Sequence, residues 1–255
     1  MALEQLELGT GLNKVEIAIA LLQAWEPPEG YYLAFSGGKD SVAIYDLAEK
    51  AGVKFDAHYC VSPIDPPQIY KFIRAHYPDV QWDYHAKGFW QIVVKKGLPL
   101  RTSRWCCEII KEAGGEGRVV IVGNRRAEGG RRRNQCFVET PEQSKGKGYK
   151  YTSKTFIRPV IHFDNHDIWQ YIRENNLPYC SLYDQGFKRL GCVLCPFSNQ
   201  IEREELYFPK MVANWKQACE RIVIDRKMRG KPVKHKFETG EELYQWWVSG
   251  RRNGN

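Results

Sequence analysis

Apolar residues along the first half of the chain recur at two spacings, one typical of helices and the other of buried strands. The helical segments have apolar side chains three or four positions apart and cover residues 12–25, 41–51, 66–77 and 88–96. The strand segments are short apolar runs between turn residues and cover residues 31–35, 54–61 and 81–85. Strands and helices that alternate in this way predict a parallel sheet with helices on both faces.

The second half of the chain begins with a continuous apolar run over residues 119–123, which is typical of a strand buried on both faces. A polar stretch over residues 125–154 predicts a loop, with a hairpin near Phe137 and residues 149–151. The next predicted elements are a strand over residues 156–161 and a helix over residues 165–175 with Asp164 as its N-cap.

The chain becomes irregular from residue 178 onward. Helices are expected over residues 202–226 and 239–248, with a basic linker over residues 227–236 between them. We therefore expect an α/β fold with a doubly wound, mostly parallel sheet, a cysteine-rich region and a helical C-terminal extension. Residues 1–198 would form the α/β domain, and residues 199–255 would form the extension packed on it.

The loop between the first predicted strand and its helix contains six residues suited to a phosphate: Ser36-Gly37-Gly38-Lys39-Asp40-Ser41. The two glycines let the backbone approach a phosphate closely, and the start of the helix offers N–H donors. Ser36 and Ser41 add hydroxyl groups, and Lys39 adds a full positive charge. The alternative is a glycine-rich turn without a ligand.

This loop differs from the Gly-x-x-x-x-Gly-Lys-Ser/Thr loop of the common nucleotide triphosphatases. It resembles the pyrophosphate (PP) loop of the adenine-nucleotide alpha hydrolase, or ATP pyrophosphatase, superfamily. The resemblance implies that the chain binds ATP and cleaves it between the α and β phosphates, or binds a related adenylate. Mg²⁺ would neutralise the departing pyrophosphate, and Asp40 is the nearby carboxylate that would hold it.

Four of the eight cysteines occur in two pairs, namely Cys106-Cys107 and Cys192 with Cys195. Four thiolates are the usual ligands of an iron–sulfur cluster or a structural zinc. Adjacent cysteines are awkward for one tetrahedral zinc, whereas a cubane spreads its four ligand positions over several ångströms. Zinc and metal-free core cysteines remain the alternatives.

The cysteine spacing resembles that of the four-iron four-sulfur (4Fe-4S) proteins of the phosphoadenosine phosphosulfate (PAPS) reductase family. Matching segments are Gly123-Asn124-Arg125-Arg126-Ala127-Glu128, Arg158-Pro159-Val160, Asp167-Ile168-Trp169 and the run from Leu182 to Cys192. The resemblance implies a 4Fe-4S cluster on Cys106, Cys107, Cys192 and Cys195. It also implies that Arg125 and one of Arg131 or Arg132 meet the transferred or anionic group, and that Glu128 belongs to the loop that binds the nucleotide. Gly129 stands where the family often has serine.

The chain has 38 Lys and Arg against 30 Asp and Glu, a formal net charge of +8. This surplus suits an anionic ligand or a nucleic acid. Arginines gather at residues 125–133, and a second basic stretch covers residues 226–236. Guanidinium groups bind phosphate oxygens in a bidentate manner. The alternative to anion binding, for both stretches, is a solvated basic loop or linker.

A sulfonucleotide reductase needs a nucleophilic cysteine, which the resembling enzymes carry in a C-terminal Glu-Cys-Gly-(Ile/Leu)-His segment. The last cysteine here, Cys219, lies in a predicted helix instead. The leading hypothesis is an ATP-pyrophosphatase-type enzyme that adenylates an acceptor for sulfur incorporation into nucleic acid, of the DNA phosphorothioation or tRNA thiolation type. The alternatives are a PAPS or adenosine phosphosulfate (APS) reductase with a non-standard nucleophile, and a non-catalytic nucleotide-binding accessory subunit.

The expected partners are an adenine nucleotide, DNA or tRNA, and a cysteine desulfurase or other sulfur donor protein. Cys136 follows the arginine-rich stretch and is a candidate persulfide carrier, with a plain structural cysteine as the alternative. Trp246 and Trp247 are expected to pack the last helix rather than to stack bases. The chain has no signal-like start and no apolar run of membrane-spanning length, so a cytoplasmic location is expected.

Overall fold

The computed structural model describes Leu3 and residues 11–144, 153–230 and 237–252. The strands are β1 (Tyr31–Ala34), β2 (Phe55–Cys60), β3 (Gln81–Asp83), β4 (Val119–Ile121), β5 (Val138–Glu139) and β6 (Thr155–Ile157). The first seven α-helices are α1 (Lys14–Ala24), α2 (Lys39–Ala51), α3 (Pro67–His76), α4 (Phe89–Lys96), α5 (Trp105–Ile110), α6 (Pro141–Ser144) and α7 (Asn165–Glu174). They are followed by α8 (Ile201–Tyr207), α9 (Pro209–Met228) and α10 (Gly240–Arg252).

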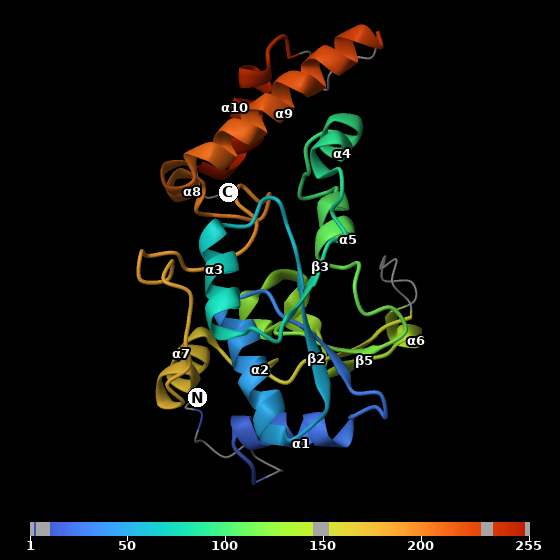
Figure 1. The fold of residues 1–255 in the computed structure, drawn as a ribbon, viewed down its shortest axis with the longest axis vertical. Coiled ribbons are helices and arrows are strands. Elements are labelled where there is room, and N and C mark those ends of the chain that lie inside the picture. Colours follow the sequence, from blue (N-terminus) through green and yellow to red (C-terminus); the bar gives the residue numbers. More distant parts are fainter. Residues whose placement is uncertain (1–2, 4–10, 145–152, 231–236, 253–255) are drawn as a thin grey trace. The chain divides into compact units, whose positions relative to one another are not determined.

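The described strands form one sheet in the order β3-β2-β1-β4-β6-β5 (Figure 1). All neighbours are parallel except β5 and β6, which are antiparallel. The strand order reverses at β1, since β2 lies on one side of it and β4 on the other. Open α/β sheets bind ligands in the crevice beside the carboxyl ends of strands at such a reversal. The predicted α/β class with a mostly parallel sheet is therefore confirmed.

The chain divides into two compact units that interleave in sequence. The first unit comprises Met1–Cys60, Pro67–Asp83 and Ala113–Leu190, and holds the whole sheet. The second comprises Val61–Pro66, Tyr84–Glu112 and Gly191–Asn255, and holds both cysteine pairs and the last helices. The sequence predicted two consecutive segments instead, and the boundary at residue 198 stays a prediction.

A buried ion pair joins two helices of the first unit. Asn13 caps α1 with a capping box completed by Glu16, and Asp164 caps α7 as predicted, with Asp167 completing that box. The ammonium of Lys14 in α1 lies 2.5 Å from a carboxylate oxygen of Asp167, and both side chains are almost fully buried. The pairing compensates two charges that would each be costly to bury alone.

Tryptophans form the core of the second unit. Trp215 of α9 is 1% exposed, and its ring centroid lies 4.7 Å from that of Trp247 of α10. The indole N–H of Trp247 donates to the carbonyl of Pro99 at 2.8 Å. Trp247 therefore packs the last helix, as predicted for this residue.

The single helix expected over residues 202–226 is wrong, because the structure has two helices there. Helix α8 ends at Tyr207, and α9 begins at Pro209. Phe208 has a non-helical backbone with φ −124° and ψ 52°. A proline clashes with a preceding helical residue and has no N–H to donate, but it suits the first turn of a new helix.

The polar stretch after β4 is more ordered than the sequence indicated. It contains two 3₁₀ helices, η1 (Arg126–Glu128) and η2 (Gly130–Asn134), followed by β5 and α6. A hairpin was expected near Phe137 and residues 149–151. Strand β5, which follows Phe137, instead pairs with β6, and residues 149–151 lie outside the described part of the chain. Arg158 forms a buried ion pair with Glu139 at 2.6 Å, which fixes β5 against the sheet. Helix α5 was not predicted.

Among the described residues, no helix combines the length and apolar character needed to cross a bilayer.

Candidate functional site

The loop from Ser36 to Ser41 connects the carboxyl end of β1 to the first turn of α2. The Ser41 hydroxyl donates to the Gly38 carbonyl at 2.8 Å, and the Ser36 hydroxyl donates to Ser41 Oγ at 3.3 Å. Gly38 is the N-cap of α2 and makes no side-chain cap. The backbone N–H groups of this turn and the positive end of the helix dipole form an arrangement suited to phosphate.

Gly37 is the loop position where the backbone requires glycine. Its φ is +71°, and a Cβ atom there would lie 2.9 Å from Ile69 Cγ2 of α3. Gly37→Ala is expected to lower the free energy of unfolding by more than the roughly 1–2 kcal/mol that a left-handed alanine costs. Gly52→Ala is the matched control, since Gly52 has φ +68° with no atom within 4 Å of its Cβ position. Equal losses in urea unfolding would show that the contact with α3 is unimportant.

Lys39 and Tyr183 lie together beside this loop. Lys39 is 4% exposed, and its ammonium lies 3.5 Å from Asp40 Oδ2 and 5.7 Å from the centre of the Tyr183 ring. The Lys39 backbone N–H donates to the Tyr183 hydroxyl at 2.9 Å. Burial raises the pKa of Tyr183, so its hydroxyl stays protonated. Sequence reasoning gave Tyr183 no role, although it lies in the matching segment from Leu182 to Cys192.

Asp40 brings the Gly-rich loop and the arginine-rich stretch together. Its Oδ1 atom lies 2.6 Å from Arg125 Nε, and the Arg125 side chain is buried. Neither atom makes an aligned hydrogen bond among the described residues. Gly123 allows this approach, because a Cβ there would lie 3.2 Å from the Asp40 backbone. The site therefore lies beyond the carboxyl ends of β1 and β4, the neighbouring strands at which the order reverses.

Glu128 organises the rest of the arginine-rich stretch. One carboxylate oxygen accepts the backbone N–H of Arg125 at 3.1 Å, and the other forms an ion pair with Arg132. Arg126 points elsewhere, because it donates to the Gln135 carbonyl and contacts His162. Arg131 belongs to η2, but its side chain lies outside the described part. The structure thus brings Lys39, Asp40, Arg125, Glu128 and Arg132 into one chain of contacts.

All four paired cysteines line one small pocket in the second unit, with apolar neighbours such as Ile64, Leu194 and Trp215. Cys106 and Cys107 lie in the first turn of α5, and Cys192 and Cys195 lie in a turn before α8. The two pairs are 85 residues apart in sequence, so only the fold brings them to the same pocket.

Cationic side chains surround these sulfur atoms. Arg104 Nη2 lies 3.5 Å from Cys107 Sγ. A hydrogen bond from Cys106 lowers the pKa of Cys107 to about 5, against burial and with help from Arg104 and Lys111. Burial disfavours the charged form of Lys111, but Asp65 and the thiols outweigh burial and raise its pKa. The pocket therefore stabilises the thiolate of Cys107, the form that binds metals, whereas the hydrogen bond with Cys107 raises the pKa of Cys106 and burial raises the pKa of Cys192.

The second cysteine pair is held by a carboxylate from the C-terminal helices. Leu194 adopts φ 58°, and its N–H donates to Glu204 Oε2 of α8 at 2.7 Å. Glu204 also accepts the Ser198 hydroxyl at 2.6 Å, and the Val193 N–H donates to the Ile64 carbonyl at 2.7 Å. Glu204, Lys111 and Asp65 were missed in the sequence, where no motif marks them.

The remaining cysteines differ in exposure. Cys136 is exposed, which is compatible with a persulfide carrier, and that role stays a prediction. Cys180 is buried and Cys60 is half-buried. Cys219 is fully buried in α9, and burial raises its pKa to about 12. Cys219 is therefore neither accessible nor ionised, as an attacking thiolate must be.

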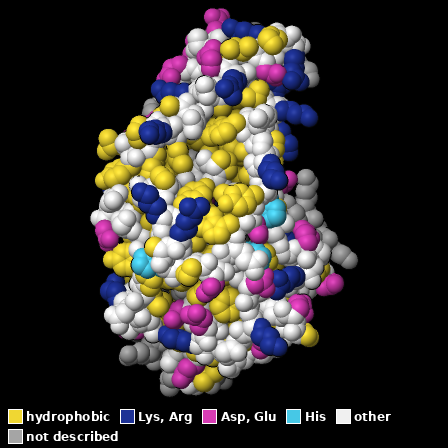
Figure 2. All heavy atoms as spheres, in the orientation of Figure 1, with side chains coloured by type: hydrophobic (Ala, Val, Ile, Leu, Met, Phe, Trp, Pro, Cys, Tyr) yellow, Lys and Arg dark blue, Asp and Glu magenta, His cyan; other side chains and the backbone are white. Residues whose placement is uncertain are grey.

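Basic side chains are distributed widely over the surface. Lys and Arg side chains are scattered across the face drawn in Figure 2, and acidic side chains lie among them. Arg118 with Asp56, and Lys216 with Glu241, are paired examples. The net charge of +8 therefore does not by itself locate a binding surface.

The sheet order and the loop define a nucleotide-binding α/β domain. Residues 30–198 match the family described as the phosphoadenosine phosphosulfate reductase domain. The match covers more than half of the chain, so the chain belongs to the PAPS reductase domain family.

Curated relatives of this chain have different names. An adenosine 5'-phosphosulfate reductase of Lysinibacillus sphaericus is 35% identical over 64% of this chain and 71% of its own length. A probable FAD synthase of Schizosaccharomyces pombe is 28% identical over 74% of this chain and 67% of its own length. An uncharacterised protein of Methanocaldococcus jannaschii is 30% identical over 72% of this chain and 40% of that protein. The chain spans less than half the length of this archaeal relative.

A solved structure has the same fold. The crystal structure of PAPS reductase from Candida auris, a phosphate complex, covers 71% of this chain and 88% of its own, with a TM-score of 0.50 and 21% identity. At this identity the likeness shows the fold alone. The sequence and structure comparisons together define a PAPS reductase-like and FAD synthase-like nucleotide-binding domain.

Proposed function

We propose that the chain is an ATP-pyrophosphatase-type enzyme that adenylates an acceptor, for sulfur incorporation into nucleic acid. The contact between Asp40 and Arg125 carries this proposal, because it joins a phosphate-binding loop to a guanidinium group across two neighbouring strands. The loop would hold the β and γ phosphates of ATP. Arg125 and Arg132 would then face the α phosphate, where charge develops during transfer.

The reaction itself is a displacement at the α phosphorus. An acceptor oxygen, either a backbone phosphate oxygen or a base carbonyl oxygen, forms a bond to this phosphorus. A base carbonyl acceptor loses the proton of the neighbouring ring N–H, and the bond from the α phosphorus to the β-phosphate oxygen breaks. Pyrophosphate leaves with the electron pair and is stabilised by Lys39 and the helix N-terminus. The terminal sulfur of a donor-protein persulfide, such as that of a cysteine desulfurase, then bonds to the acceptor atom, and AMP leaves with the electron pair. A second thiol then attacks the remaining S–S bond, which leaves a disulfide and the thiolated acceptor.

Mg²⁺ suits this site, because Asp40 Oδ1 is a buried carboxylate oxygen without an aligned hydrogen bond. When bound, Mg²⁺ would neutralise phosphate charge. Asp40 would hold Mg²⁺ directly or through water, and this role would loosen its contact with Arg125. Lys39, which lies beside Asp40, would turn toward the phosphates at the same time.

The paired cysteines fit an iron–sulfur cluster. Their donor set is four sulfur atoms in one pocket, and Lys111 and Arg104 balance the charge of the thiolates. We propose a 4Fe-4S cluster on Cys106, Cys107, Cys192 and Cys195, which would hold or pass sulfur, or brace the second unit. Zinc bound by the same four thiolates is the alternative.

The test uses protein purified without oxygen. ATP and Mg²⁺ are supplied with sulfide as the sulfur source and with DNA, tRNA, flavin mononucleotide or no acceptor, and AMP and pyrophosphate are measured. PAPS or APS with thioredoxin is supplied in parallel, and sulfite is measured. We expect AMP and pyrophosphate in the nucleic-acid reactions. Sulfite would establish the reductase alternative. Flavin-dependent pyrophosphate and FAD without free AMP would indicate FAD synthesis, and nucleotide binding without any turnover would indicate an accessory subunit.

A further inference from the structure

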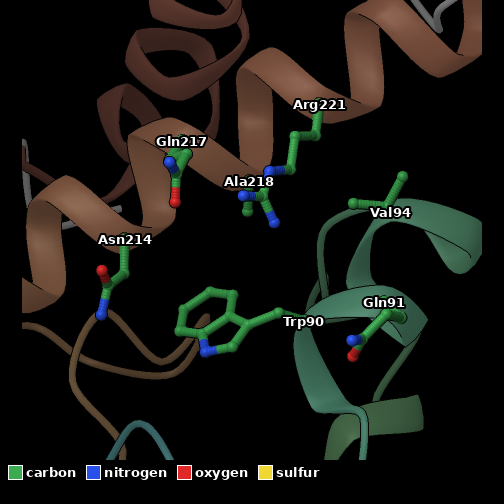
Figure 3. Close-up of a pocket in the computed structure, with 7 residues that line it drawn as sticks. All are labelled: Trp90, Gln91, Val94, Asn214, Gln217, Ala218 and Arg221. Carbon is green, nitrogen blue, oxygen red and sulfur yellow. The ribbon is translucent and has the colours of Figure 1, made fainter.

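A pocket of about 230 Å³ lies between α4 and α9 in the second unit. Figure 3 shows the indole of Trp90 extending from α4 toward α9, while Asn214, Gln217 and Arg221 point from α9 toward α4. The ring centroid of Trp90 lies 5.1 Å from that of Trp215 at an interplanar angle of 76°. Because Trp215 is fully buried, this edge-to-face contact fixes the Trp90 ring in place.

The polar side chains that line this pocket have unused hydrogen-bonding capacity. Among the residues that the structure describes, Gln91, Asn214, Gln217 and Arg221 make no hydrogen bond or ion pair through their side chains. The three amides each offer both a donor and an acceptor, and Arg221 offers a planar set of donors. An indole bordered by amides and a guanidinium group matches a planar heteroaromatic ring with polar edges and an adjoining anion.

The charge around the pocket also favours an anion. Helices α4 and α9 together have seven Lys and Arg residues and two acidic residues. Lys210, Lys95 and Arg221 are exposed and lie one helical turn from the lining amides Asn214, Gln91 and Gln217, respectively. Asp225 lies one turn after Arg221, but its carboxylate is paired with Arg229 at 2.9 Å.

We infer that this pocket binds an unpaired nucleobase of a nucleic-acid strand. The base stacks on Trp90, its edge is hydrogen-bonded by Asn214 and Gln217, and the adjoining phosphate is bound by Arg221. This inference deepens the proposed function, since it rests on a nucleic-acid acceptor and assigns the second unit to holding it. An acidic peptide would match the charge of the pocket, but not the ring and the amides.

The test compares two labelled single-stranded oligonucleotides of equal length and charge, one with bases and one with abasic sugars. Fluorescence anisotropy of the full chain gives each affinity at several salt concentrations, and the two strands are compared at the same concentration. The wild type is expected to bind the base-bearing strand more tightly. Trp90→Ala is expected to remove most of that difference, by roughly tenfold. Arg221→Gln is expected to weaken binding of both strands and to lower the salt slope by about one.

Matched controls exist in the same chain. Trp25→Ala removes an indole that is 45% exposed and far from the pocket in sequence, and Lys50→Gln removes a cation of the first unit that is paired with Asp46. Both should bind as the wild type does. Trp90→Ala also removes core packing, so the exposed pair Asn214→Leu and Gln217→Leu tests the same site without that loss, and it should weaken the base-bearing strand alone.

Equal affinity of the wild type for the two strands would overturn the inference, because binding would then require only phosphate. Wild-type affinity in the Trp90 and the Asn214/Gln217 variants would do the same. Failure of the proposed function has a different signature. In that case base-dependent binding through Trp90 is present, while nucleic acid produces no AMP and pyrophosphate from ATP.

Discussion

Exchanging Asp40 for asparagine is expected to lower the rate of AMP formation from ATP by about 100- to 1,000-fold, which is typical of losing one preorganised charge at a reaction centre. The same exchange should destabilise the first unit, because Arg125 is 4% exposed and loses the carboxylate 2.6 Å from its Nε atom. A buried pair that loses one partner costs up to about 3–5 kcal/mol. The cost here should lie at the lower end, since the Asp40 side chain is 24% exposed.

The double variant Asp40→Asn/Arg125→Gln separates the two effects. It removes both charges, so urea unfolding should show part of the lost stability restored relative to the single variant. Turnover should not recover, because both groups would still be missing from the reaction. Asp46→Asn is the control on the same helix, where the carboxylate pairs with Lys50 instead. Recovery of turnover in the double variant would show that the pair is only structural.

The loop was predicted because its chemistry is local. Six consecutive residues between a strand and a helix contain the glycines, the hydroxyl groups and the lysine. The contact between Asp40 and Arg125 has no such signature. It exists because β1 and β4 are neighbours in the sheet, although their first residues, Tyr31 and Val119, are 88 positions apart in the sequence. Strand order is not encoded in any one segment. The resemblance indicated both residues, but not that they touch.

The cysteine pairs illustrate a second limit of prediction from the sequence. Their spacing predicted a shared ligand, and the structure places all four around one pocket. The sequence grouped them with the sheet, whereas they belong to the unit that contains the last helices. A contact of Glu204 explains why the sequence did not reveal this grouping. Its carboxylate in α8 accepts the N–H of Leu194, and no sequence motif marks a glutamate that makes such a tertiary contact. The break at Pro209, by contrast, could have been predicted from the proline itself, although a single helix was expected over residues 202–226.

Metal binding at this pocket should control the stability of the second unit. Cys107→Ser is expected to abolish the absorbance of the cluster, or the bound zinc if zinc is the metal, because serine replaces the thiol that most readily ionises. Losing a structural metal costs several kcal/mol. The unfolding transition of the second unit should fall by about 10 °C or more, since 1 kcal/mol shifts a domain of this size by about 4–8 °C.

The loss of stability is expected in the second unit alone, because all four paired cysteines belong to it. Calorimetry should show the transition of the first unit unchanged, and ATP binding through the Ser36–Ser41 loop should persist in Cys107→Ser. Cys136→Ser is the control, because Cys136 is exposed and belongs to the first unit. It should keep the metal and both transitions. Iron, sulfide and zinc analysis of the wild type identifies the metal. Wild-type protein that binds no metal would show that these thiols are ordinary core residues, and a Cys107→Ser variant that keeps the metal would show that Cys107 is not one of its required ligands.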